Sequence, residues 1–186
     1  SDTGLARYDL RNPDNPWTTY LPATFKTQYA GGRIRDLAVD AHGTLWIASE
    51  QGVTRFQAPQ STIYTTENTN GGLTTGIVRA IAVAPDGKIW VGTEKGVSCF
   101  DPTIAPGTWI NFATTLPEET PLADDSVADL AVADNGLVWI ATNAGAGYYD
   151  PAQQRWTKFR EETTDGGLVS NQVTAVSIEG HTSIWF

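Results

Sequence analysis

Short apolar runs rich in β-branched residues recur along the chain at a nearly constant interval. They occupy Ile34–Val39, Val78–Val83, Val127–Val132 and Val173–Ile178. Continuous runs of this kind are typical of strands that are covered on both faces. Each run is followed by a turn such as Pro85-Asp86-Gly87, where glycine supplies the positive φ that a hairpin needs. Because the apolar positions alternate or form short blocks without a helical period, the pattern predicts an all-β protein.

A tryptophan lies in the strand that follows each of these turns. The four residues, separated by 44, 49 and 46 positions, are Trp46, Trp90, Trp139 and Trp185. Two further strand signals complete each repeat: a run ending in an aromatic residue, then an outer strand that carries an aromatic pair in three of the four repeats. Repeats of this length with four strands match the blade of a β-propeller. We expect the tryptophans to pack between blades, where a change to alanine costs about 3–5 kcal/mol.

The sequence therefore predicts a β-propeller made of four-stranded antiparallel blades, with four repeats in one domain over residues 1–186. The repeats cover approximately 34–66, 77–113, 126–160, and 173–186 joined to 4–21. The fourth blade is thus split between the two termini. Three arrangements would complete it: a closed four-bladed ring, an exchange of halves between two chains into an eight-bladed ring, or a longer chain.

Composition and charge exclude several classes of partner. The formal charge of −9 and the pI near 4.5 argue against nucleic acid and anionic membranes, since phosphates need a basic face. No apolar run approaches the roughly 20 residues of a membrane helix, so we expect no membrane insertion by this chain. We expect the single cysteine, Cys99, to be a small buried hydrophobic residue. His42 and His181 lie in equivalent turns, and no cluster has zinc spacing, so we expect neither a metal nor a cofactor.

Three stretches of the sequence resemble a known repeat. Val78–Val97 reads Val-x-Ala-Ile-Ala-x-x-x-x-Gly-x-Ile-Trp-x-Gly-Thr-x-x-Gly-Val, Gly166–Val173 reads Gly-Gly-Leu-x-x-Asn-x-Val, and Tyr149–Pro151 reads Tyr-Asp-Pro. This text resembles the two-component regulator propeller repeat, and the resemblance extends over essentially the whole chain. It implies a propeller that serves in signal transduction as the sensor part of a bacterial hybrid histidine kinase, or a free-standing secreted propeller. It also implies a periplasmic or extracellular location.

One rim of the predicted propeller gathers the candidate binding residues. Strand direction places the turns between second and third strands on the same rim as the loops that lead into each inner strand. These turns supply Asp2, Glu50, Glu94, Lys95 and Asn143. Arg35 and Arg79, at matching positions on neighbouring inner strands, are expected near the channel mouth, where two guanidinium groups would hold a carboxylate or phosphate. Alternatively, the arginines pair with Asp36, Asp129 or the rim glutamates.

The sequence contains no nucleophile elbow and no phosphate-binding loop. It favours a non-enzymatic module that binds or senses a small molecule or glycan at the rim. It also favours a protein partner or self-association through the split blade. Two alternatives remain. One is an enzyme, such as a lyase or hydrolase acting on polysaccharides or small molecules, with catalytic groups drawn from separate blades. The other is a purely structural interaction platform.

Overall fold

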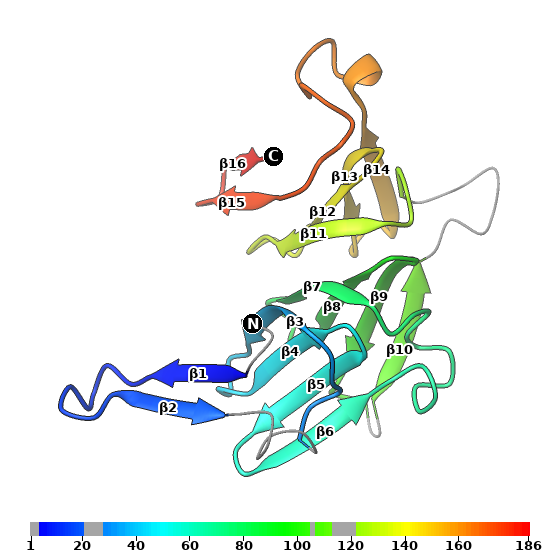
Figure 1. Ribbon diagram of the computed structural model, residues 1–186. Coiled ribbons are helices and arrows are strands. Elements are labelled where there is room, and N and C mark those ends of the chain that lie inside the picture. The colour runs from blue at the N-terminus through cyan, green and yellow to red at the C-terminus, as the bar shows by residue number, and fades with distance from the viewer. Residues whose placement is uncertain (1–3, 21–27, 105–106, 113–121) are drawn as a thin grey trace.

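The computed structural model describes residues 4–20, 28–104, 107–112 and 122–186. Within these ranges the chain forms three four-stranded antiparallel sheets and two two-stranded hairpins (Figure 1). A short 3-10 helix, Glu161–Thr163, follows the last of the four-stranded sheets. The strands in chain order are β1 (Leu5–Tyr8), β2 (Trp17–Tyr20), β3 (Ile34–Val39), β4 (Leu45–Ser49), β5 (Gly52–Gln57), β6 (Gln60–Tyr64), β7 (Val78–Val83), β8 (Ile89–Thr93), β9 (Gly96–Asp101), β10 (Thr108–Phe112), β11 (Val127–Val132), β12 (Val138–Thr142), β13 (Gly145–Asp150), β14 (Arg155–Phe159), β15 (Ser177–Glu179) and β16 (Ser183–Trp185).

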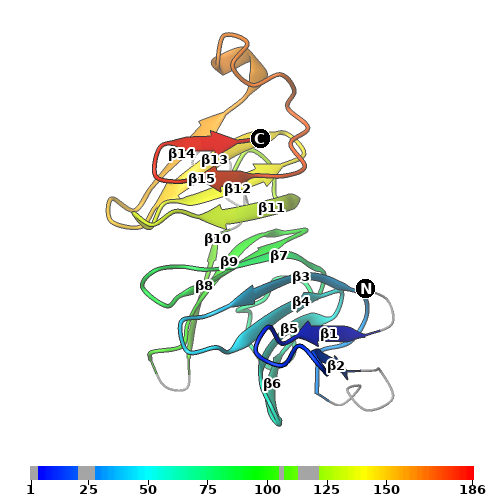
Figure 2. The ribbon, with the colours of Figure 1, turned by 90° about the vertical axis from the view of Figure 1, so that its left-hand side faces the viewer.

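Each four-stranded sheet is a simple meander, in which neighbouring strands in space are also neighbours in sequence. We name them blade 1 (β3–β6), blade 2 (β7–β10) and blade 3 (β11–β14). Their first strands, β3, β7 and β11, pack against one another along the inner side, so the blades fan out one after another (Figure 2). This arrangement confirms the predicted all-β fold with four-stranded antiparallel propeller blades.

The second strand of each blade forms the core. Every residue of β8 is buried, whereas the outer strand β10 has exposed and half-buried positions only. Trp46 and Trp90 are 1% and 3% exposed and lie in the hydrophobic clusters that join blade 1 to blade 2 and blade 2 to blade 3. The predicted packing role holds for these residues and for the half-buried Trp139. It does not hold for Trp185, which is 63% exposed in the single chain.

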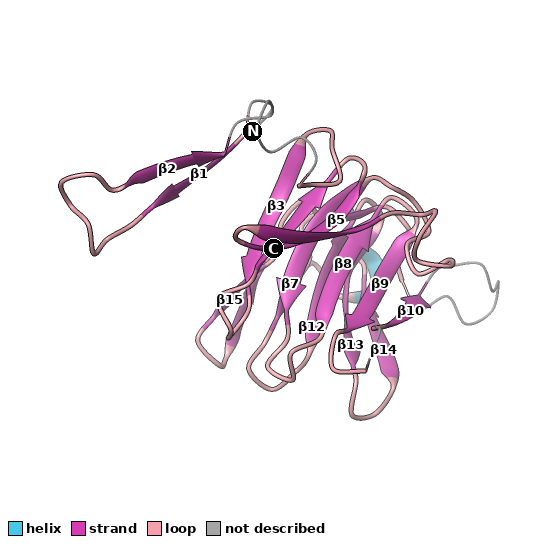
Figure 3. Cartoon of the chain, turned by 90° about the horizontal axis from the view of Figure 1, so that it is seen from below, coloured by secondary structure: helices cyan, strands magenta, loops and turns pink. Residues whose placement is uncertain are grey.

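The split blade consists of two separate halves. The N-terminal hairpin β1–β2 supplies the third and outer strands and projects beside blade 1, whereas the C-terminal hairpin β15–β16 supplies the inner and second strands beside blade 3 (Figures 1 and 3). The two hairpins do not pair with each other. The inner strand predicted over Val173–Ile178 was placed too early, because the segment that pairs with β16 is Ser177–Glu179.

Candidate functional site

Three equivalent turns build the rim predicted to carry the site. In each blade, the hydroxyl group at the end of the second strand donates a hydrogen bond to the carbonyl oxygen of the glycine that opens the third strand. The three bonds, at 3.0, 2.8 and 2.7 Å, are Ser49 to Gly52, Thr93 to Gly96 and Thr142 to Gly145. These glycines have φ of +137°, +106° and +138°, a region that other residues rarely adopt. The same hydrogen bond and the same glycine conformation therefore frame the two residues of each rim turn.

A β-bulge aims one arginine of each of two inner strands toward this rim. The ladder between the inner and second strands shifts register between Ile34 and Asp36 in blade 1, and between Val78 and Ala80 in blade 2. The extra residue at these bulges is Arg35 or Arg79, the pair predicted from the sequence. A bulge re-aims the side chain of the residue it inserts.

Each of these arginines forms an ion pair with the glutamate of its own blade. Arg35 Nη2 lies 2.5 Å from Glu50 Oε1, and Arg79 Nη2 lies 2.5 Å from Glu94 Oε1. All four side chains are about one-third exposed. The structure thus matches the alternative in which rim glutamates neutralise the arginines. Because the pairs are exposed to solvent, they add little to stability and remain accessible to a ligand.

The Glu50 carboxylate is held by a second donor as well. The backbone N–H of Arg33 donates to Glu50 Oε2 at 3.2 Å, the carboxylate oxygen that does not contact Arg35. This backbone hydrogen bond and the Arg35 guanidinium lower the pKa of Glu50 below its ordinary value. Glu50 therefore stays ionised and oriented, which is what a hydrogen-bond acceptor in a binding site requires.

The other predicted rim residues have different surroundings. Asn143 Nδ2 donates to Ser126 Oγ at 3.1 Å, which ties the turn of blade 3 to the loop that leads into β11. The backbone of Lys95 is fixed by Thr74 and Thr93, so that its position in the turn is set by blade 2. Asp2 lies outside the described residues.

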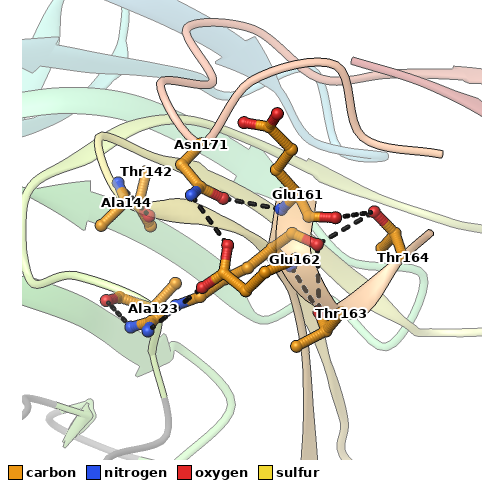
Figure 4. A network of polar contacts seen from close by, with 9 residues as sticks. Ala123, Thr142, Ala144, Glu161, Glu162, Thr163, Thr164 and Asn171 are labelled. Carbon is orange, nitrogen blue, oxygen red and sulfur yellow. Dashed lines mark hydrogen bonds and ion pairs between the residues drawn. The ribbon is translucent and has the colours of Figure 1, made fainter. Parts of the chain in front are cut away.

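A polar network on the loop after β14 was not predicted from the sequence. Asn171 accepts a hydrogen bond from the backbone N–H of Glu161 at 2.8 Å and donates to Glu162 Oε2 at 3.1 Å (Figure 4). Arg160 completes the network: its Nη2 donates to the carbonyl oxygen of Ala123 at 3.3 Å, and its Nη1 lies 3.9 Å from Glu162 Oε1. The signal that could have found it is the Asn of the Gly-Gly-Leu-x-x-Asn motif. This network shapes the rim beside blade 3.

Grooves open between successive blades on the opposite rim. A groove of about 450 Å³ lies between blades 1 and 2, and another of about 450 Å³ lies between blades 2 and 3. The turn histidines belong to this rim: His42 lines the first groove, and His181 Nδ1 lies 3.0 Å from Asp134 Oδ2. Within the part of the chain that the structure describes, no group of three His, Cys, Asp or Glu side chains is placed to hold a metal ion. In the same ranges, no helix is long and apolar enough to cross a membrane.

Comparison with known families decides what kind of repeat this is. The sequence model of the two-component regulator propeller family matches residues 28–51 and 72–95. Each match contains an inner strand, the tryptophan strand and most of the rim turn that follows. Two repeats of this chain match the two-component regulator propeller family. The resemblance stated from the Gly-x-Ile-Trp-x-Gly-Thr text is thereby confirmed.

Solved structures with the same fold include larger proteins. The extracellular domain of a putative hybrid two-component system from B. thetaiotaomicron aligns with 82% of this chain at 19% identity and a TM-score of 0.71. Virginiamycin B lyase from Staphylococcus aureus aligns with 98% of it at 12% identity and a TM-score of 0.64. This chain spans 22% and 55% of their respective lengths. At these identities the similarity establishes the propeller fold alone. No curated protein matches the chain in sequence.

Proposed function

We propose that this chain is a non-enzymatic ligand-binding module of a bacterial sensor, located in the periplasm or outside the cell. The two-component regulator propeller repeats support this role, as does the shared fold with an extracellular domain of a putative hybrid two-component system. The observation that carries the proposal is the pair of ion pairs, Arg35–Glu50 and Arg79–Glu94, presented at equivalent positions of neighbouring blades.

The chemistry of these pairs selects the class of ligand. Each pair places guanidinium N–H donors beside carboxylate acceptors, and its net charge is zero. A free anion would meet two carboxylates as well as two guanidinium groups, so the electrostatic gain expected from unpaired arginines is largely cancelled. A hydroxyl group both donates and accepts hydrogen bonds and therefore suits both members of a pair. A neutral, hydroxyl-rich ligand such as a glycan fits this rim best.

Binding to a panel of neutral oligosaccharides, with small carboxylates and phosphates alongside, tests the proposal. Thermal shift would select candidates, and calorimetry would measure affinity. We expect a saccharide to bind and the double variant Arg35→Ala/Arg79→Ala to lose about 10-fold or more in affinity, because two charge-assisted contacts disappear. The control is Arg155→Ala, an exposed arginine at the start of β14 on the opposite rim. Unchanged saccharide affinity in the double variant, or no saccharide binding at all, would refute the proposal.

The same samples separate binding from turnover. A saccharide that is recovered intact after prolonged incubation supports a sensing role. A shortened or unsaturated product would instead support the alternative of a lyase or hydrolase built on the propeller scaffold. Binding of proteins without any small ligand would support the interaction platform.

A further inference from the structure

The second-strand tryptophans of blades 1 and 2 have different surroundings at their indole N–H groups. In blade 1, Trp46 Nε1 donates a hydrogen bond to Asp40 Oδ2 at 3.0 Å, and both residues line the groove between blades 1 and 2. The residue at the position of Asp40 in blade 2 is Ala84, whose side chain has no acceptor. Trp90 is 3% exposed and lines the groove between blades 2 and 3. In the part of the chain that the structure describes, no group accepts a hydrogen bond from Trp90 Nε1.

The Trp90 ring is oriented in its blade as the Trp46 ring is. Each ring stacks on the outer-strand aromatic residue of its own blade, with centroids 6.3 Å apart and planes at 16° for Trp46, and 5.7 Å and 20° for Trp90. Each also contacts the third-strand aromatic residue of the next blade, at 5.9 Å and 58° for Trp46, and 5.6 Å and 54° for Trp90. Trp90 Nε1 therefore points to the space beside Ala84 where blade 1 has a carboxylate.

A small residue leaves room in the groove beside Trp90. The ladder of blade 1 pairs Trp46 with Arg55, whose guanidinium group lies over the indole ring at 5.9 Å. The ladder of blade 2 pairs Trp90 with Cys99 instead. Ala84 and Cys99 both line the groove between blades 2 and 3, which has a volume of about 450 Å³. This volume falls within the range of small-molecule pockets, about 300–1,000 Å³.

A second buried side chain without a hydrogen-bond partner lines the same groove. Tyr149 is 9% exposed and takes the third-strand position that Phe100 has in blade 2. Burial raises the pKa of Tyr149, so the hydroxyl group is neutral near pH 7. Among the described residues, none forms a hydrogen bond with this hydroxyl group. Buried polar groups usually have a partner, so two of them without one in a single groove indicate a ligand.

The charges around the groove favour a neutral ligand. Of the described residues that line it, Lys88 is the only cation, and its ammonium group donates to Asp86. Asp134, also in the lining, contacts His181 at 3.0 Å. A carboxylate or phosphate would therefore meet no unpaired cation in the groove. It would also approach a protein with a formal charge of −9.

We propose that the groove between blades 2 and 3 is a binding site for a neutral, mainly apolar molecule that carries an amide group. The amide oxygen accepts from Trp90 Nε1, which can only donate, and the amide N–H suits the Tyr149 hydroxyl group, which can also accept. The apolar part of the ligand contacts the remaining walls, which include Pro85, Ile110, Phe112, Pro151 and Ala152. This site lies on the rim opposite the Arg35–Glu50 pair and does not depend on the function proposed there.

The indole N–H signals report directly on this contact. The chain has seven tryptophans, so a nitrogen–proton correlation spectrum of the isotope-labelled chain resolves their indole groups, and Trp90→Phe identifies the signal of Trp90. Benzamide is the probe, with benzoate as a charged match and toluene as a match without oxygen. We expect benzamide to move the Trp90 proton signal downfield until saturation, and benzoate to bind about 10-fold more weakly because of the acidic surroundings.

Three results of this titration would overturn the proposal. The first is a Trp90 signal that benzamide does not move in a saturable way. The second is tighter binding of benzoate than of benzamide. The third is a downfield shift with toluene as large as the shift with benzamide, because toluene has no acceptor for the indole N–H.

Ala84→Asp is the decisive variant, because it gives blade 2 the acceptor that blade 1 has. The new carboxylate takes the place of the ligand oxygen beside Trp90 Nε1, so we expect the fold to be kept and benzamide affinity to fall about 10-fold or more. The matched control is Ala133→Asp, which offers the same acceptor to the buried, unpartnered Nε1 of Trp139, outside this groove. It should leave benzamide affinity unchanged.

Tyr149→Phe tests the second contact in a variant that keeps the aromatic ring. It removes the hydroxyl group alone and should lower benzamide affinity about 5-fold, as for one neutral hydrogen bond. Circular dichroism would verify that each variant folds. The Arg35→Ala/Arg79→Ala variant should bind benzamide as wild type does, so the sites on the two rims can fail separately. Equal benzamide affinity in wild type and in either folded groove variant, Ala84→Asp or Tyr149→Phe, would contradict the proposal.

Discussion

Asp36 and Ile81, 45 positions apart in sequence, are joined by a hydrogen bond across the boundary between blades 1 and 2. The Asp36 carboxylate accepts the backbone N–H of Ile81 at 2.8 Å. The same bond recurs two boundaries further along, after blade 3, where Asp129 accepts the N–H of Val176 at 2.9 Å. At the boundary between them the matching residue is the buried Ala80. Alternate blade boundaries are therefore held by a polar contact, and the one in between is held by apolar packing.

Replacing this aspartate should destabilise the fold. Asp36→Ala leaves the half-buried N–H of Ile81 without its carboxylate acceptor, and a lost partner of this kind costs about 1–3 kcal/mol. Asp129→Ala should behave in the same way. The free energy of unfolding in urea measures the effect, with Asp14→Ala, an exposed residue of the turn between β1 and β2, as the control. Equal unfolding free energies for Asp36→Ala and Asp14→Ala would contradict this role.

These aspartates show what sequence reasoning could and could not reach. The alternation of Asp36, Ala80 and Asp129 along the inner strands is visible in the sequence, and so is the period that predicts the blades. The partner of each aspartate is not visible, because it is a backbone N–H of the next blade that becomes available only once the blades are packed. The Arg35–Glu50 pair was anticipated as one alternative. Choosing this alternative over the others required the geometry of the rim turn, which brings the Glu50 carboxylate within reach of Arg35.

The ends of the chain limited the prediction in another way. The repeat pattern in the sequence assigns a residue to a strand whether or not a neighbouring strand is present to pair with it. Val173 and Val176 therefore read as part of an inner strand, although the structure pairs only Ser177–Glu179. For the same reason Trp185 reads as a buried packing residue. Burial depends on the facing blade, which the repeat does not encode.

The glycine of the rim turn should tolerate no side chain. At Gly52, with φ of +137°, an added Cβ would collide with the backbone carbonyl oxygen of Tyr64. At Gly43, with φ of +78°, an added Cβ meets nothing within 4 Å, so only backbone strain opposes it. Strain alone costs about 1–2 kcal/mol. We expect Gly43→Ala to lose that amount and Gly52→Ala to lose more, as measured by urea unfolding. A smaller loss for Gly52→Ala than for Gly43→Ala would show that the rim turn yields to the clash.

The thiol of Cys99 should be unreactive until the protein unfolds. Cys99 is 4% exposed, and burial raises its pKa to about 12, so almost no thiolate forms near neutral pH. We expect a thiol reagent at pH 8 to label the native protein at the rate of unfolding only. The same reagent in urea should label it at the rate of a free cysteine. Rapid labelling of the native protein would show that blade 2 opens locally around Cys99.

Stability should depend on pH through Asp40 and Trp46. Partial burial tends to raise the pKa of Asp40, but hydrogen bonds from Trp46 Nε1 and the backbone N–H groups of Thr44 and His42 outweigh it, and the pKa falls below 3.8. A carboxyl group with a lowered folded pKa stabilises the protein above its unfolded pKa. That contribution is lost as pH falls through the folded value. The unfolding free energy of wild type minus that of Asp40→Asn should therefore be constant from about pH 5 to 7 and shrink below pH 3.8. In a Trp46→Phe background, which lacks the Nε1 donor, this pH-dependent difference should be smaller. If the difference in unfolding free energy between wild type and Asp40→Asn stays the same from pH 7 to pH 3, Asp40 is not a source of pH-dependent stability.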